Sequence, residues 1–250
     1  MPNILKPIVF LHIPKTGGST LNHTLKNIKD QNNINYLQRG ERGYLPKFSF
    51  DHFKPQGGKK FLSGHFVFSD QCKNVDLYTL VRDVHKNFFS NLYFKYFHTY
   101  LQKKRNLDNV KKINENIFFK LTLSENDAPI IIKLLENNFI TSNIFTKTIS
   151  GIPYEKYFYV ENDYKITQSD YEAAINNLKY FKLIGNMDSF EVFINKFISF
   201  YGFSLQSYIY QNVSNYDRNF IDLMIKKLYQ QIIDYNYYDY LLMKEIEKNL

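Results

Sequence analysis

The chain contains very little cysteine: Cys72 is the single one among 250 residues. A lone cysteine excludes an intrachain disulfide and fits a protein of a reducing compartment. The sequence also lacks an apolar run of the roughly 18 residues that a transmembrane helix needs. The apolar segment near the N-terminus, Ile8–Leu11, is far too short for the core of a signal peptide. Together these absences predict a soluble, cytoplasmic protein.

Metal-ligand patterns and an excess of acidic charge are also missing. No cluster of Cys and His, and no spacing of acidic residues, is typical of a metal site, so no metal is expected. The 32 Lys and Arg outnumber the 24 Asp and Glu, which gives a formal net charge of +8. A basic protein favours anionic partners such as nucleotides, nucleic acids, acidic glycans or a membrane surface. Because the basic runs are short and no recognised nucleic-acid-binding motif occurs, a nucleic-acid partner is not expected.

Apolar residues make up 44% of the sequence, which is ample for a globular core. Short apolar runs that indicate buried strands alternate with segments of helical periodicity. Strands are predicted at 8–11, 75–81, 154–162 and 181–185. Helices are predicted at 19–28, 84–103, 124–137, 169–180, 188–201, 219–234 and 238–250. The polar, glycine-containing residues 30–58 are predicted to form a long, partly irregular excursion. This order predicts an α/β fold of P-loop-like, three-layer type, in which helices flank a central mainly parallel sheet. A single domain over residues 1–250 is expected.

A loop rich in glycine and hydroxyl groups follows the first predicted strand, in the segment HIPKTGGST at residues 12–20. The backbone N–H groups that begin the next helix are unpaired, and the helix dipole adds positive potential, so this position favours an anion. Gly17 and Gly18 permit backbone torsions and a close approach that a Cβ would block. Lys15 adds a positive charge. The hydroxyl donors of the loop are Thr16, Ser19 and Thr20. The loop predicts a site for a phosphate or a related group, with an ordinary strand-to-helix turn as the alternative.

The order of these residues disfavours a standard P-loop NTPase. In the Walker A pattern GxxxxGK[ST] the lysine follows the glycines, whereas here Lys15 precedes Gly17 and Gly18. A nucleotide kinase would also need a carboxylate for Mg²⁺ after a strand, and none is evident. A P-loop-type nucleotide kinase nevertheless stays open as an alternative function. So does a non-catalytic module that binds an acidic polymer.

The order Pro-Lys-Thr-Gly-Gly-Ser closely resembles the 5′-phosphosulfate loop of sulfotransferases that use 3′-phosphoadenosine 5′-phosphosulfate (PAPS). The resemblance is to the Golgi-type carbohydrate sulfotransferases and their bacterial relatives, including the glycosaminoglycan 2-O-sulfotransferases. It implies that Lys15 stabilises the leaving 5′-phosphate during the transfer. It also implies that the phosphosulfate is held by Lys15, Thr16, Gly17, Gly18, Ser19 and Thr20.

The same family has a strand that ends in Arg-Asp and a serine eight residues after the arginine, and these two residues hold the 3′-phosphate of PAPS. The segment YTLVRDVHKNFFS supplies Arg82 and Ser90 at that spacing. An arginine fork suits a phosphate, and a serine on a helix adds a donor. The family usually has proline after Arg-Asp, whereas Val84 stands here. A surface arginine and an unrelated helical serine are the alternative interpretation.

Between these motifs lies FLSGHFVFS, in which Gly-His resembles the segment that carries the catalytic base of the 2-O-sulfotransferases. The resemblance implies that His65 is a general base, and an unperturbed histidine pKa of about 6.5 suits that role. Those enzymes commonly have a second histidine just before the glycine, where this chain has Ser63. His12, which precedes the loop, is interpreted first as structural, with a supporting role at the site as the second possibility.

Weaker matches continue the resemblance to about Glu247. Residues 143–151 match an Asn-x-x-Thr-Arg segment with Lys147 in place of arginine, and residues 181–197 match a strand and helix with Asp188 where glutamate is common. Residues 210–217 and 234–246 match a late Asn loop and a terminal helix. The resemblance implies transfer of a sulfuryl group from PAPS to a carbohydrate or another hydroxyl-bearing acceptor, with an acidic glycan as one candidate. The product of the donor would be 3′-phosphoadenosine 5′-phosphate (PAP). The sequence identifies neither the acceptor nor the oligomeric state.

Overall fold

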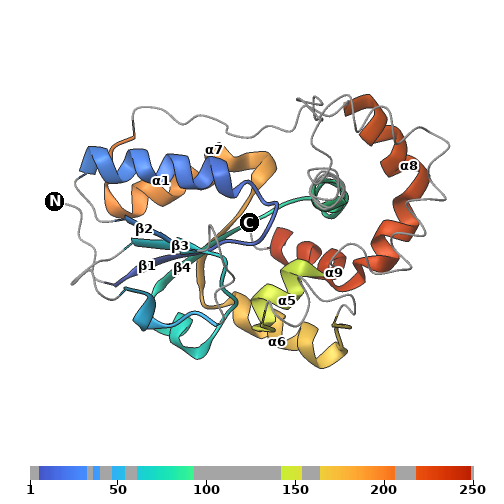
Figure 1. Ribbon diagram of the computed structural model, residues 1–250, viewed down its shortest axis with the longest axis horizontal. Coiled ribbons are helices and arrows are strands. Elements are labelled where there is room, and N and C mark those ends of the chain that lie inside the picture. The colour runs from blue at the N-terminus through green and yellow to red at the C-terminus, as the bar shows by residue number, and fades with distance from the viewer. Residues whose placement is uncertain are drawn as a thin grey trace, which may run out of the picture.

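A computed structural model describes residues 6–32, 36–39, 47–53, 61–92, 142–153, 164–205 and 218–248. Within these residues five strands form one sheet in the order β2-β3-β1-β4-β5, and every neighbouring pair is parallel (Figure 1). The strands are β1 (Ile8–Leu11), β2 (Tyr36–Arg39), β3 (Phe61–Gly64), β4 (Asp76–Val81) and β5 (Phe181–Asn186). The predicted parallel α/β sheet is therefore confirmed.

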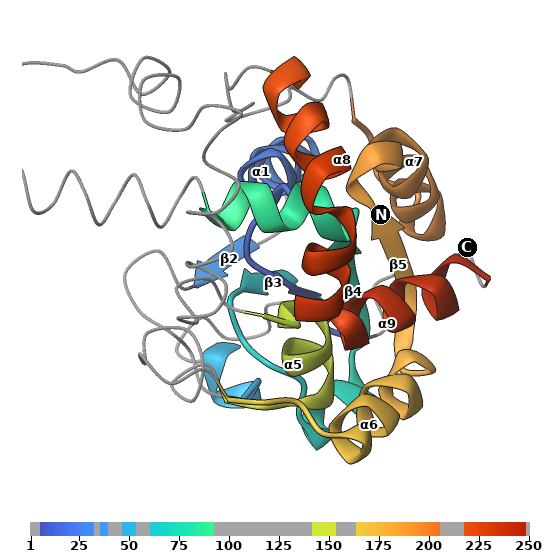
Figure 2. The same cartoon turned by 90° about the vertical axis from the view of Figure 1, so that its right-hand side faces the viewer.

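Helices cover both faces of the sheet. On one face α1 (Gly18–Asn32) and α7 (Phe190–Tyr201) lie side by side, as Figure 1 shows. The other face is covered by α5 (Ile144–Ser150), α6 (Gln168–Leu178), α8 (Arg218–Tyr235) and α9 (Tyr237–Glu247). Residues 84–92 are also helical, and Figure 2 shows them beside α8, where the rings of His85 and Tyr229 stack with centroids 4.4 Å apart. The arrangement has the three layers that the sequence predicts.

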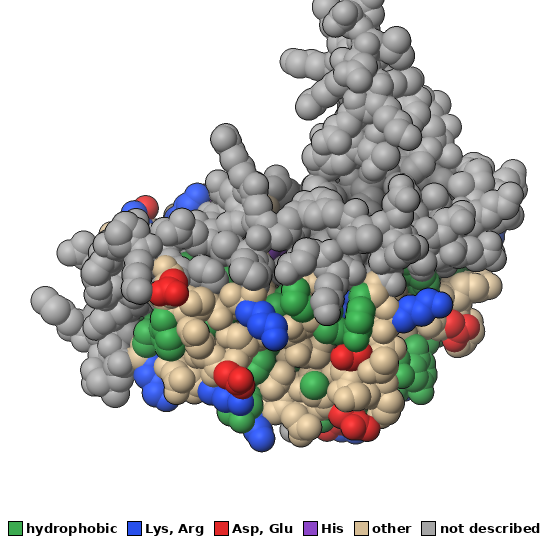
Figure 3. All heavy atoms as spheres, turned by 60° about the horizontal axis from the view of Figure 1, so that its bottom comes forward, with side chains coloured by type: hydrophobic (Ala, Val, Ile, Leu, Met, Phe, Trp, Pro, Cys, Tyr) green, Lys and Arg blue, Asp and Glu red, His purple; other side chains and the backbone are tan. Residues whose placement is uncertain are grey.

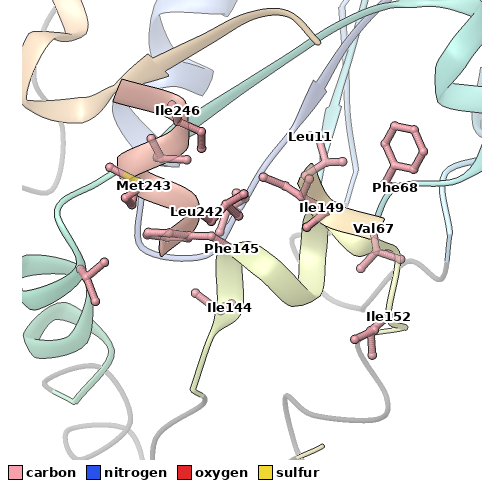
Figure 4. Close-up of a cluster of buried hydrophobic side chains, with 14 of the residues drawn as sticks. Leu11, Val67, Phe68, Ile144, Phe145, Ile149, Ile152, Leu242, Met243 and Ile246 are labelled. Carbon is pink, nitrogen blue, oxygen red and sulfur yellow. The ribbon is translucent and has the colours of Figure 1, made fainter. Parts of the chain in front are cut away.

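The side chains of the central strand alternate between two hydrophobic cores. Ile8 and Phe10 pack with α1 and α7, whereas Val9 and Leu11 pack with the helices of the opposite face. Because both faces are buried, the strand is a continuous apolar run, which is why the sequence predicts it with the bounds that the structure has. Figure 4 shows part of the second core, where side chains of α5 and α9 gather near Leu11.

A reciprocal pair of caps joins α5 to α9. The carboxylate of Asp239 accepts hydrogen bonds from the N–H groups of Phe145 (3.0 Å) and Thr146 (2.7 Å) and from the Thr146 hydroxyl (2.8 Å). In return, the side-chain oxygen of Asn143 accepts from the N–H groups of Tyr238 (2.9 Å) and Asp239 (3.1 Å). Each side chain satisfies first-turn N–H groups of the other helix, which would otherwise be buried without a partner.

Most predicted elements agree with the structure to within a few residues, but β2, β3 and α5 were not predicted. The prediction of an irregular excursion over 30–58 is wrong for β2, which is a short strand at the sheet edge, where no continuous apolar run is needed. The helix α5 was matched as a motif but not predicted as a helix. The helix predicted at 84–103 is confirmed as far as residue 92. Its remainder, the helix predicted at 124–137 and the strand predicted at 154–162 lie outside the described residues.

Charges of one sign do not gather on the face of the described residues that Figure 3 draws. On the face drawn in Figure 3, basic and acidic side chains of the described residues are interspersed. Some of the exposed pairs are close, such as Lys73 and Asp70 or Lys86 and Asp188, the latter at 2.8 Å. Among the described helices, none combines the length and the apolar character needed to cross a lipid bilayer.

Candidate functional site

The predicted site residues follow the carboxyl ends of neighbouring strands. The loop with Lys15 follows β1, His65 follows β3 and Arg82 follows β4. Because these strands are parallel and adjacent, their carboxyl ends meet at one edge of the sheet. The chain leaves β1 toward β2 and leaves β4 toward β5, so the connections diverge between β1 and β4. Such a divergence point is where open α/β sheets bind their ligands.

The loop after β1 has a strained backbone. Lys15 has a φ of 65° and Gly17 a φ of 84°, so two of three consecutive residues are left-handed. For a non-glycine residue such as Lys15 this conformation costs on the order of 1–2 kcal/mol, and such strain gathers at binding sites. The Thr16 hydroxyl donates to the Ile13 carbonyl at 2.8 Å and so fixes the loop. That hydroxyl has no second proton for an anion, which leaves Thr16 only its backbone N–H as a donor to a ligand.

Both glycines of the loop make room for protein side chains. A Cβ on Gly18 would lie 1.6 Å from Nε2 of His12, and a Cβ on Gly17 would lie 2.2 Å from Sδ of Met187. The sequence assigned these glycines to the close approach of a ligand. In the structure the space beside each of them is filled by His12 or Met187, so the loop backbone is held from both sides.

Two histidines lie against each other at the end of β1. The Nδ1 atom of His65 is 2.9 Å from the carbonyl oxygen of His12, and their rings stack with centroids 4.0 Å apart at 24°. Because a carbonyl can only accept, Nδ1 of His65 carries the hydrogen and Nε2 holds the lone pair of the neutral ring. Burial lowers the pKa of His65, the hydrogen bond to His12 raises it, and the charge of Lys15 lowers it further. His65 is therefore a neutral base at neutral pH.

Two cations are held close together beside this pair. Burial lowers the pKa of Lys15 to about 8, and the nearby charge of Arg82 lowers it further. The Nε atom of Arg82 is buried and has no hydrogen-bond partner among the described residues. Holding two like charges in a largely buried place costs folding free energy, which an anionic ligand would offset. The arrangement can therefore bind an anion and place it near a base.

Protein-family models and curated proteins do not assign this site. Neither the protein-family models nor the curated proteins give a match to this chain. Among the described residues, no three Cys, His, Asp or Glu side chains converge as metal ligands would. The ligand therefore has to be inferred from the chemistry of the residues at the site, and PAPS as the donor stays a prediction.

The helix that follows Arg82 is tied to the loop after β1. Asp83 begins the helix by accepting from the N–H of Lys86 at 3.0 Å, and the side-chain amide of Asn87 donates to the Pro14 carbonyl at 3.2 Å. Ser90 lies on the same helix and is buried, with 5% of its surface exposed. Within the described part of the chain, no hydrogen bond joins Ser90 to Arg82 or to the loop. The structure thus brings Arg82 to the site and leaves the role of Ser90 as a prediction.

The remaining predicted residues are divided between surface and core. Ser19 is exposed in the first turn of α1, whereas Thr20 is buried. Ser63 is buried and donates to the side-chain oxygen of Asn22 at 2.9 Å, so it ties β3 to α1.

Met187 and Asn87 support the loop and were not predicted, because no spacing in the sequence marks a side chain that packs against a backbone.

Proposed function

We propose that this protein transfers a sulfuryl group from PAPS to a hydroxyl group of a carbohydrate or a similar acceptor. The observation that supports this most is the convergence of Lys15, His65 and Arg82, which come from three different connections of the sheet. Lys15 acts electrostatically on His65, and Arg82 acts on Lys15. A base beside two cations fits a reaction in which a hydroxyl attacks an anionic donor.

The two cations suit the two anionic ends of the donor. Lys15 and the N–H groups at the start of α1 would hold the phosphosulfate, since a helix N-terminus and a lysine both favour negative charge. The other residues that would hold the phosphosulfate are Thr16, Gly17, Gly18, Ser19 and Thr20. Arg82 would hold the 3′-phosphate through its guanidinium fork, with Ser90 as a further donor. The buried Nε of Arg82 is a donor that such a ligand would satisfy.

His65 and Lys15 have different roles on the two sides of the sulfur atom. His65 accepts the proton of the acceptor hydroxyl on Nε2 while the acceptor oxygen bonds to sulfur. The bond between sulfur and the bridging oxygen of the 5′-phosphate breaks, and PAP leaves with that oxygen. Lys15 stabilises the negative charge that grows on this oxygen, an effect that is strong because the ammonium group is already in place. The proton later passes from the His65 imidazolium to water.

Binding of PAP tests the proposal directly. A ligand at about 100 times its Kd stabilises a protein by about 2.7 kcal/mol, so PAP should raise the temperature of unfolding. ADP, which lacks the 3′-phosphate, should do so much less, and Arg82→Ala should abolish the preference for PAP over ADP. The matched control is Lys26→Ala, which removes one positive charge from an exposed position of α1 and should leave PAP binding unchanged.

The same thermal measurement separates the alternatives. A clear stabilisation by ATP with none by PAP would overturn the proposal in favour of a nucleotide kinase. Stabilisation by PAP without turnover of labelled PAPS on any glycan acceptor would favour a non-catalytic binding module. No stabilisation by any of these nucleotides would contradict the anion site itself.

The pKa of Lys15 predicts that PAP binding depends on pH. Lys15 loses its proton above about pH 8 in the free protein, and a bound anion favours the charged form. The affinity for PAP should therefore be constant below pH 8 and fall by up to about tenfold per pH unit above it. Calorimetric titration between about pH 6.5 and about pH 9.5 measures this dependence. In Lys15→Arg the guanidinium stays charged, so the affinity should be flat. A flat profile in the wild type would contradict the role of Lys15.

A further inference from the structure

We propose that His12 is a positioning residue for His65: it holds the imidazole of His65 in one orientation and one tautomer. The catalytic consequence rests on the proposed function, because it assumes that His65 is the base. The positioning itself is a statement about two side chains and can be tested without any substrate.

His12 constrains His65 through two separate groups. Its carbonyl oxygen lies 2.9 Å from Nδ1 of His65, and its ring stacks on the His65 ring at 4.0 Å and 24°. The hydrogen bond sets which edge of the imidazole points toward the backbone. The stacked ring limits rotation out of that plane. A single residue thus fixes both the direction and the tilt of the base, and Nε2 is left as the nitrogen that can take a proton.

His12 is itself held from two sides. Its N–H donates to the Gly64 carbonyl at 2.9 Å, next to His65 in the sequence. Its ring lies so close to the first residue of α1 that a side chain on Gly18 would overlap Nε2. That Nε2 atom is buried and has no hydrogen-bond partner among the described residues. The ring therefore gains no hydrogen bond through Nε2 from the described residues, and it stacks on the ring of His65.

The same geometry suits the proton transfer. Lys15 of the loop acts on His65 through its charge, whereas His12 acts on it through the hydrogen bond to its carbonyl. Burial, His65 and Lys15 together keep the pKa of His12 well below its usual range, so His12 stays neutral. When His65 accepts a proton, its imidazolium lies against the stacked ring of His12, which is neutral and so adds no repulsive charge. The Nδ1–H bond to the carbonyl is kept, so no side chain has to move.

Nitrogen-15 NMR of labelled histidines in the free protein tests the proposal. In the wild type the neutral His65 ring should be a single tautomer with its hydrogen on Nδ1. His12→Ala keeps the backbone carbonyl but removes the stacked ring, so the His65 ring should turn away from the carbonyl in part of the molecules. In those molecules the second tautomer should appear, and the pKa of His65 should rise toward about 6.5 because the ring becomes hydrated. Gly18→Ala offers an independent perturbation: its new Cβ displaces the His12 ring without changing His12, and it should shift the His65 signals in the same direction. The signals of His23, elsewhere on α1, are the internal control.

Kinetics give the second readout. His12→Ala should lower kcat by between about tenfold and about 10²-fold, with KM for PAPS nearly unchanged, because a misplaced base slows only the chemical step. Unchanged His65 signals in both variants would overturn the proposal. Altered His65 signals in a protein that never uses PAPS would leave the positioning correct and show that the proposed function is wrong.

Discussion

Replacing His65 by alanine is expected to lower the rate of sulfuryl transfer by about 10²–10⁴-fold, the usual contribution of a general base. His65 is neutral at neutral pH because burial and Lys15 lower its pKa, and the His12 carbonyl directs its hydrogen to Nδ1. Without this ring the acceptor hydroxyl has to lose its proton to water. Single-turnover rates with labelled PAPS and a saturating acceptor measure the loss.

The matched control for that experiment is His23→Ala, which makes the same change on α1, away from the end of β3, and should leave the rate unaltered. PAP binding by His65→Ala should also stay normal, since His65 is assigned to the acceptor and not to the donor. The wild-type rate should fall at acid pH as His65 gains a proton, and this fall should be absent in the variant. A His65→Ala protein with near-normal turnover would remove His65 from the mechanism.

Asp239→Ala is expected to lower the free energy of unfolding by about 3–5 kcal/mol, the cost of breaking a buried charged network by removing one partner. The carboxylate accepts three hydrogen bonds from Phe145 and Thr146, at 2.7 to 3.0 Å. Its loss leaves two backbone N–H groups at the start of α5 without an acceptor, and it removes a negative charge close to the buried Lys147. Urea denaturation followed by circular dichroism measures the change.

Asp234→Ala is the control for this variant. Asp234 is exposed on α8 and accepts one hydrogen bond from Gln230 at 2.8 Å, so its loss should change the free energy of unfolding by no more than about 0.5 kcal/mol. Asp239→Asn should fall between the two, because its amide can still accept from Thr146 but presents a donor to the Phe145 N–H. If Asp239→Ala cost less than about 1 kcal/mol, the caps would not be what secures α5.

The sequence predicts the sheet well where a strand is buried on both faces. β1 is the clearest example, since Ile8 to Leu11 are all apolar and all buried. The parallel order then brings Lys15, His65 and Arg82, which the sequence proposes for the site, to one edge of the sheet. β2 was missed because a strand at a sheet edge has no such run, and YLQR carries little pattern of its own.

The contacts that support the site could not be predicted in the same way. The glycines were assigned to a ligand, but Gly18 faces the ring of His12 and Gly17 faces Met187, which is far away in the sequence. Likewise, the segments 143–151 and 234–246 appear as two separate weak matches. The bonds between Asn143, Thr146 and Asp239 show that they form one structure. Such pairings depend on which side chains meet in space, and periodicity carries no information about that.

The caps between α5 and α9 also determine the order in which parts of the chain can fold during synthesis. Thr146 and Asp239 are 93 residues apart in the sequence. A ribosome that adds about 5–20 residues per second needs roughly 5–20 s to cover that distance. During this interval α5 has been synthesised but its first turn lacks its cap, whereas β1, β3 and β4 are already complete. The strand ends that carry the proposed anion site can therefore come together in the nascent chain before the helices of the opposite layer are secured.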